Sequence, residues 1–122
     1  NVEQIIKLIK NEKKEKVVSI ALTTNNLGAL PENLNELPKL IKLYANNIDL
    51  KELTELDKGV IGNLKYINLE HNYSLSDGSK EFLKQLKKDK EEKKEQFIMS
   101  YTLTGDELNQ ALGYPEKSEL DR

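Results

Sequence analysis

Residues 17–27 read VVSIALTTNNL, with apolar residues at regular places and an asparagine near the end. Residues 40–50 (LIKLYANNIDL) and 64–74 (LKYINLEHNYS) follow the same order, and we call this eleven-residue pattern the repeat phrase. The three copies start 23 and then 24 residues apart. A motif that recurs at a fixed period of this size is typical of a chain built from stacked, similar units. The sequence therefore predicts such a stack.

The first copy matches the pattern L-x-x-L-x-L-x-x-N-x-L at every marked position when Val and Ile are counted with Leu. In this pattern and its period, the chain resembles the leucine-rich repeat family over residues 17–75. The resemblance implies an α/β fold: a short solenoid (a right-handed β-α superhelix) with a small parallel sheet and helical caps. Two copies depart from the pattern. Ile48 stands at the ninth position and Ala45 at the sixth in the second copy, and Ser74 ends the third.

Apolar and polar residues alternate within each copy, which predicts strands with one buried face at residues 18–22, 41–45 and 65–69. The asparagine at the ninth position sits where the chain leaves the strand. Its amide is expected to satisfy backbone groups that the turn would otherwise bury unpaired. We therefore assign a structural role to the core and turn residues Leu22, Asn25, Leu43, Ile67, Leu69 and Asn72.

Residues 1–16 are predicted to form an N-terminal capping helix. Their apolar residues recur at i, i+3, i+4 and i+7 over residues 2–13, which indicates one apolar helical face. A stack of repeats needs such a cover, because its end unit otherwise exposes its core to water. The residues of this face are Val2, Ile5, Ile6 and Ile9.

Two irregular returns connect the copies, at residues 28–39 and 50–63. Pro31, Pro38 and Gly59 argue against long regular helices in them. We expect short turns or 3₁₀ pieces there.

Residues 76–115 are predicted to form a longer helix-strand-helix unit at the other end. The segment SDGS at residues 76–79 indicates a turn before a helix, which leads to a fourth strand at residues 97–103. The segment TGDE at residues 104–107 matches a capping box that opens a last short helix. Residues 116–122 are polar and are expected to fray.

The family resemblance also implies where a partner binds, because outward strand residues line an open concave face in leucine-rich repeats. On this chain the second and third strands place two tyrosines, several amides and one residue of each charge there. Tyrosine is enriched in interfaces, yet these tyrosines could equally serve only to cover the sheet. The predicted partner-binding residues are Lys42, Tyr44, Asn46, Tyr66, Asn68, Glu70 and His71.

Composition argues against several other functions. The net charge of the 122 residues is −2, and lysines and acidic residues are interspersed, without the basic cluster of a nucleic-acid site. Cysteine is absent and His71 is the single histidine, so we predict no metal and no cofactor. Glu70 and His71 are neighbours on a strand and are expected to diverge, which argues against an acid–base pair and an enzyme. No apolar run approaches the ~20 residues that span a bilayer.

These observations predict a non-catalytic protein-protein interaction module that binds a protein or peptide on the concave strand face. The alternative is a structural or assembly end-piece of a larger protein or oligomer, which docks through its caps. In that case, changes at Phe82, Leu83, Phe97 or Tyr101 should impair solubility or assembly. Because the chain begins at Asn1 rather than Met, an exported or cell-surface protein is favoured over a cytoplasmic one.

Overall fold

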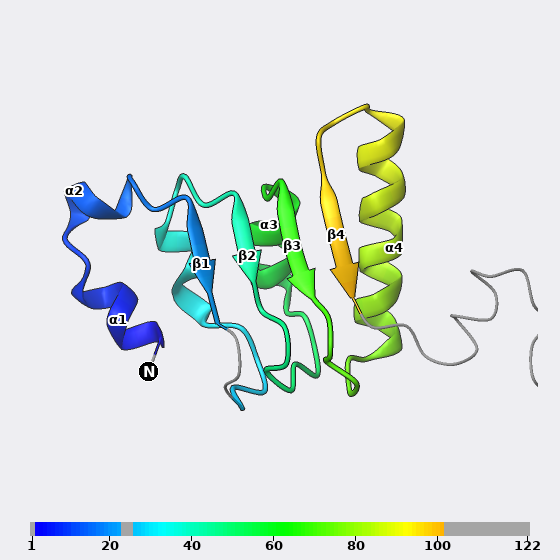
Figure 1. Cartoon of the computed structure of the whole chain (residues 1–122), viewed down its shortest axis with the longest axis horizontal. Helices are drawn as coiled ribbons and strands as arrows, with labels where there is room; N and C mark the ends of the chain where they lie inside the picture. The colour runs from blue at the N-terminus through cyan, green and yellow to red at the C-terminus, as the bar shows by residue number, and fades with distance from the viewer. Residues whose placement is uncertain (1, 23–25, 102–122) are drawn as a thin grey trace, which may run out of the picture.

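The computed structural model of the chain describes residues 2–22 and 26–101, which form an α/β unit around a parallel sheet (Figure 1). Its four strands lie side by side in chain order and point the same way. They are β1 (Ser19–Ala21), β2 (Lys42–Tyr44), β3 (Tyr66–Leu69) and β4 (Ile98–Tyr101).

The register of the sheet follows the repeat phrase. Ser19 pairs with Lys42 and Lys42 pairs with Tyr66, which are offsets of 23 and 24 residues. Tyr66 pairs with Ile98, an offset of 32 residues that reflects the longer connection. Equivalent positions of neighbouring copies therefore lie beside one another in space.

The regular strands β1, β2 and β3 are shorter than predicted. Hydrogen bonds nevertheless continue past them. The Leu22 N–H donates to the Tyr44 carbonyl at 2.7 Å, and the Val18 carbonyl accepts from the Lys42 N–H at 3.0 Å.

One face of the sheet packs into an apolar core. Leu43 and Ile67 are completely buried there, and Ile20 and Met99 on the two edge strands are half-buried. Burying an aliphatic side chain contributes about 1.5–3 kcal/mol, so these rows supply much of the cohesion between the strands. Further buried core residues are Leu22, Ala45 and Leu69 from the strand ends and Leu30, Leu34, Leu37, Leu53 and Ile61 from the returns.

The two returns differ from each other. The first contains the 3₁₀ helix η1 (Glu32–Glu36), as predicted. The second contains a regular two-turn α-helix, α3 (Glu55–Gly62), so the expectation of turns or 3₁₀ pieces was wrong there. A capping box begins α3: Thr54 Oγ1 accepts from the Asp57 N–H at 3.1 Å, and Asp57 Oδ2 accepts from the Thr54 N–H at 2.9 Å. The cap and the burial of Ile61 outweigh the cost of a glycine inside the helix.

The N-terminal segment folds as two short helices, α1 (Val2–Leu8) and α2 (Asn11–Lys14), rather than as one. The helix breaks at Lys10, which has the extended backbone angles φ −63° and ψ 144°. The predicted single apolar face was also wrong. Ile6 is completely buried, but Ile5 is 59% exposed. Contacts with η1 orient α1, since the Glu3 carbonyl accepts from Asn33 Nδ2 at 2.9 Å.

The long connection to the fourth strand is α4 (Asp77–Glu92), which lies beside β4 in Figure 1. Residues 76–79, predicted as a turn ahead of the helix, are its N-cap and first turn. The N-cap is Ser76, whose Oγ accepts from the Ser79 N–H at 3.2 Å. Leu83 faces the core and is completely buried.

Within residues 2–22 and 26–101, none of the helices has the length and apolar character needed to cross a membrane. Several predictions lie outside the described residues. They are the role of Asn25, the end of the fourth strand at residues 102–103, the capping box at residues 104–107 with its short helix, and the tail at residues 116–122.

Candidate partner-binding surface

The second face of the sheet, which we call the open face, carries the outward residues of all four strands. None of these outward residues is buried, in contrast to Leu43 and Ile67 on the core face. Two rows cross the open face: Ser19, Lys42, Tyr66 and Ile98 form the first, and Ala21, Tyr44, Asn68 and Ser100 form the second. The register therefore brings together predicted site residues that lie 24 positions apart in sequence.

Tyr44 and Tyr66 form an aromatic pair at the centre of the open face. They lie diagonally on adjacent strands, with ring centroids 5.0 Å apart and ring planes tilted by 41°. Such a pair contributes about 0.5–1.5 kcal/mol beyond its buried area. Both side chains remain half-buried, so part of each is accessible. The pair is thus held in place by its own contact while still presenting surface to a partner.

The acidic part of the open face lies just beyond the end of β3. Glu70 accepts a hydrogen bond at its carbonyl from the Asn47 N–H at 2.9 Å, as Asn68 does from the Ala45 N–H at 2.9 Å. One backbone bond of the ladder therefore reaches Glu70, which is the first residue of the turn after β3. Glu70 follows Asn68 by two residues, the spacing at which side chains share one face of a strand. Asn68 Oδ1 also accepts from the Glu70 N–H at 3.0 Å, which fixes the orientation of that amide.

His71 belongs to the turn rather than to the strand. Its φ of 62° lies in the left-handed region, so the chain departs from strand geometry at this residue. His71 Nδ1 lies 2.8 Å from the hydroxyl oxygen of Tyr73, and the two ring centroids are 5.9 Å apart. Tyr73 is 72% exposed and was not among the predicted site residues. No pattern indicated it, because turn residues follow no alternation.

Ile98 and Ser100 were also missed by the sequence reasoning. They complete the two rows of the open face beside Tyr66 and Asn68. A fourth strand was predicted at residues 97–103 without assigned faces, and the repeat period ends before β4. The 32-residue offset of β4 therefore could not be read from the sequence.

Asn72 occupies the turn after β3 and is almost completely buried, at 2% exposure. Its Oδ1 accepts from the N–H groups of Ile48 and Leu50 at 3.1 and 3.0 Å. Its Nδ2 donates to the carbonyls of Ala45 and Leu69 at 3.0 and 2.9 Å. One side chain thus satisfies backbone groups in two neighbouring turns. These contacts are structural and leave Asn72 unavailable to a partner.

A concave surface lies between η1 and α3. It is a groove of about 360 Å³ that was not expected from the sequence. Leu56 stands beside it and is 45% exposed. Its lining combines the apolar Leu34, Leu37, Pro38, Leu40, Leu56 and Val60 with the polar Asn35, Glu55 and Asn63.

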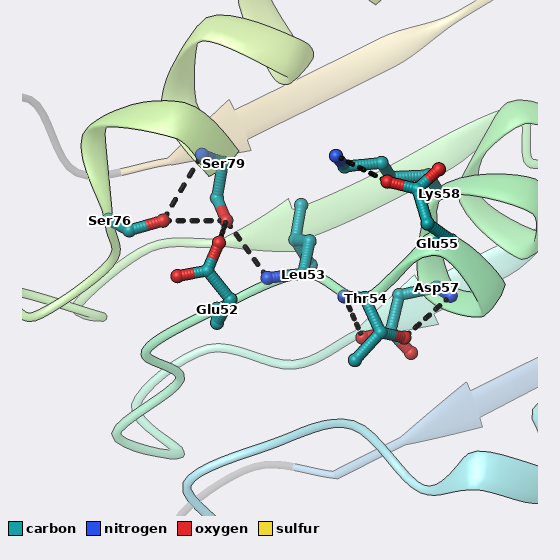
Figure 2. A network of polar contacts seen from close by, with 8 residues as sticks. All are labelled: Glu52, Leu53, Thr54, Glu55, Asp57, Lys58, Ser76 and Ser79. Carbon is teal, nitrogen blue, oxygen red and sulfur yellow. Dashed lines mark hydrogen bonds and ion pairs between the residues drawn. The ribbon is translucent and has the colours of Figure 1, made fainter.

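The polar contacts in Figure 2 join the start of α4 to the segment before α3. Ser79 Oγ accepts from the Leu53 N–H at 2.9 Å and from the Ser76 hydroxyl at 2.9 Å. It also lies 3.3 Å from Glu52 Oε1, to which it donates. A hydroxyl beside a carboxylate can belong to a nucleophilic site, but this hydroxyl is buried and engaged by three partners. The network therefore anchors the start of α4.

The described part of the chain thus offers a partner two surfaces, the open face and the groove between η1 and α3. Within this part, no group of three or more His, Asp or Glu residues is arranged to hold a metal ion. Comparison of the chain with protein-family models, curated proteins and solved structures found no match.

Proposed function

We propose that the chain is a short leucine-rich-repeat solenoid that acts as a non-catalytic module and binds a protein or peptide on its open face. Two observations support the solenoid. The first is that the offsets between β1, β2 and β3 equal the spacing of the repeat phrase. The second is that Asn72 bonds to the turn of the neighbouring unit, as a repeated turn residue should.

The Tyr44–Tyr66 pair carries the binding proposal. Tyrosine brings a large contact area and a polar tip at a low cost in side-chain entropy. This pair is held in a fixed orientation on an open face, between a lysine and a glutamate. The strands are only three or four residues long, so the face is small and we expect modest affinity.

The binding proposal is tested by affinity capture from an extract of the producing cells. The bait is the chain, beside the Tyr44→Ala/Tyr66→Ala double variant and the control Leu56→Ala, all shown to be folded by circular dichroism. Leu56→Ala removes a partly exposed apolar side chain beside the groove. We expect that the unaltered chain and the Leu56→Ala variant capture the same protein, and that the tyrosine double variant does not capture it. Loss with Leu56→Ala alone would place the partner in the groove and contradict the proposal.

A structural end-piece is the second candidate, and the exposed apolar residues at the N-terminal end favour it. Leu8 is 82% exposed, Ile5 59% and Val18 49%, whereas the outer side of a terminal repeat is normally polar. The C-terminal residues first considered for docking do not favour it. Phe97 and Tyr101 pack against the core of their own chain.

Sedimentation at increasing concentration separates the two candidates. An end-piece that joins copies of itself should associate, and Leu8→Lys should abolish the association. An interaction module should remain a monomer whether Leu or Lys stands at position 8. Because Leu8 is largely exposed, the substitution leaves the core unchanged.

A further inference from the structure

We propose that the open face selects an extended peptide segment with an acidic residue and, four positions away, a basic residue, with an aromatic or apolar residue midway between them. This inference rests on the proposed function and names the chemistry of the partner. It follows from three features of the face: the place of Lys42, the place of Glu70, and the tyrosine pair between them.

Lys42 supplies the positive end. It is exposed on the open face in the first row, directly beside Tyr66. Within residues 2–22 and 26–101, its ammonium group takes part in no ion pair. It is therefore available to a carboxylate of a bound segment.

Glu70 supplies the negative end. It is exposed in the turn directly after β3, two residues beyond Asn68 of the open face. Its carboxylate likewise makes no ion pair with the residues that the structure describes. It is available to a lysine or arginine side chain.

The separation of the two charges determines the spacing in the partner. Tyr66 lies beside Lys42, and Glu70 follows Tyr66 by four residues. At about 3.3 Å per residue, the backbone positions of Lys42 and Glu70 are roughly 13 Å apart along the strand direction. This exceeds the Debye length of about 8 Å at physiological ionic strength, so the two charges scarcely neutralise each other. An extended segment spans the same distance between positions i and i+4.

The tyrosine pair determines the residue between the charges. In an extended segment the side chains at i, i+2 and i+4 point to the same side. With i over Lys42 and i+4 over Glu70, the side chain at i+2 meets the second row, where Tyr44 and Asn68 lie. The half-buried tyrosine rings favour an aromatic or apolar side chain at that position.

The test is selection from a random library of linear dodecapeptides displayed on phage, with the immobilised whole chain as the target. We expect enriched peptides to contain an acidic and a basic residue four positions apart with an aromatic or apolar residue midway. Synthetic copies should lose about tenfold or more in affinity for Lys42→Glu/Glu70→Lys. They should bind unchanged to the matched charge swap Lys87→Glu/Glu91→Lys, which lies on exposed positions of α4. When the Lys42→Glu/Glu70→Lys variant is the immobilised target, the selected peptides should carry the acidic and the basic residue in exchanged positions.

The outcomes separate this inference from the proposed function. In one contrary outcome, the selected peptides depend on the tyrosine pair, in that they fail to bind Tyr44→Ala/Tyr66→Ala, and yet lack the charge pair and still bind Lys42→Glu/Glu70→Lys. That result would overturn the inference and leave the proposed function standing. Absence of any enriched peptide that depends on the tyrosine pair would also overturn the inference, whereas the proposed function is overturned only when affinity capture finds no protein that depends on the pair.

Discussion

The two ends of the sheet are covered by helices that differ in how firmly they are held. At the N-terminal end, α1 has seven residues and α2 four, and Ile6 of α1 is completely buried. At the C-terminal end, α4 has sixteen residues, begins at a serine N-cap, and buries Leu83, Ser79 and Lys80.

The polar contacts at the two ends differ in the same sense. Lys14 Nζ and Glu36 Oε1 lie 2.7 Å apart at the surface and join α2 to η1. Near β4, Lys90 Nζ donates to the Gly62 carbonyl at 2.8 Å and pairs with Glu95 at 3.0 Å. The two ion pairs are similarly exposed, and such pairs contribute about 0–1 kcal/mol each. The ends differ in Ser79, a buried hydroxyl of α4 that accepts from the Leu53 N–H, because a buried group that loses its partner costs about 1–3 kcal/mol.

An amphipathic pattern alone is therefore not enough to hold a helix in place. Both ends carry apolar residues at helical spacing, yet only α4 combines a buried stripe with buried polar anchors. Most of the stability of a helix in a protein comes from its tertiary packing. We therefore expect the N-terminal end to open locally before the rest of the fold, and α4 to open only with global unfolding.

The strongest test of the C-terminal end is Leu83→Ala. The side chain is completely buried, so its truncation should lower the free energy of unfolding by about 2–5 kcal/mol. Urea denaturation followed by circular dichroism measures the change. Lys87→Ala, at an exposed position of the same helix, is the control and should have little effect. A loss below about 1 kcal/mol for Leu83→Ala would show that α4 is no better held than α1.

Asn72→Leu measures how much unfolding free energy a polar anchor at the centre of the fold contributes. The losses measured at the two ends can be compared with this value. It removes the acceptor of the Ile48 and Leu50 N–H groups, so we expect roughly 3 kcal/mol of destabilisation. Hydrogen exchange should accelerate most at those two amides. Unchanged protection of both amides would contradict the assigned role.

Ser79→Ala tests the buried polar anchor of α4. It leaves the buried N–H of Leu53 without its acceptor, at an expected cost of about 1–3 kcal/mol. Glu52→Ala removes only the exposed partner of the same hydroxyl and should cost much less. Equal effects of the two variants in thermal denaturation would argue against the anchoring role.

Ile6→Ala sharpens the comparison from the N-terminal side. Ile6 is as completely buried as Leu83, but we expect a smaller loss of about 1–2 kcal/mol. The reason is that α1 can detach while the sheet stays folded. Hydrogen exchange should accelerate within residues 3–8 and not in β2 or β3. Acceleration across the whole sheet would show that the N-terminal cap unfolds together with the rest.

The smallest effect is expected from the surface pair of Lys14 and Glu36. The hydrogen bond from Lys14 holds the pKa of the Glu36 carboxyl below its ordinary value. A carboxyl whose pKa is lowered by folding stabilises the fold while it is ionised. The contribution is therefore present at neutral pH and disappears as the pH falls through the lowered pKa. In an NMR titration, Lys14→Gln should move the midpoint of Glu36 upward, and an unchanged midpoint would exclude the pair in solution.

Much of the sheet could be predicted from residues close in sequence. The alternation of apolar and polar residues placed Leu43 and Ile67 in the core and Tyr44 and Tyr66 outside it. The prediction was wrong for α3, because Gly59 was taken as evidence against a helix and the capping box of Thr54 and Asp57 was not recognised. It also failed for Ile5, whose helical spacing with Ile6 indicated burial. For α3 the local capping box and the burial of Ile61 outweighed the glycine, whereas for Ile5 the contacts of α1 with η1 decided which side of the helix is buried.

Three properties could be read from the amino-acid sequence alone: the period of the units, the offsets between β1, β2 and β3, and which side of each of these strands is apolar. These properties follow from a local alternation that repeats, so each copy carries them independently. Only the tertiary structure decided that Ile98 and Ser100 complete the open face, that Tyr73 meets His71, and that Ile5 stays in water. Each of these depends on how one segment is oriented by its contacts, and a periodic pattern does not specify that orientation.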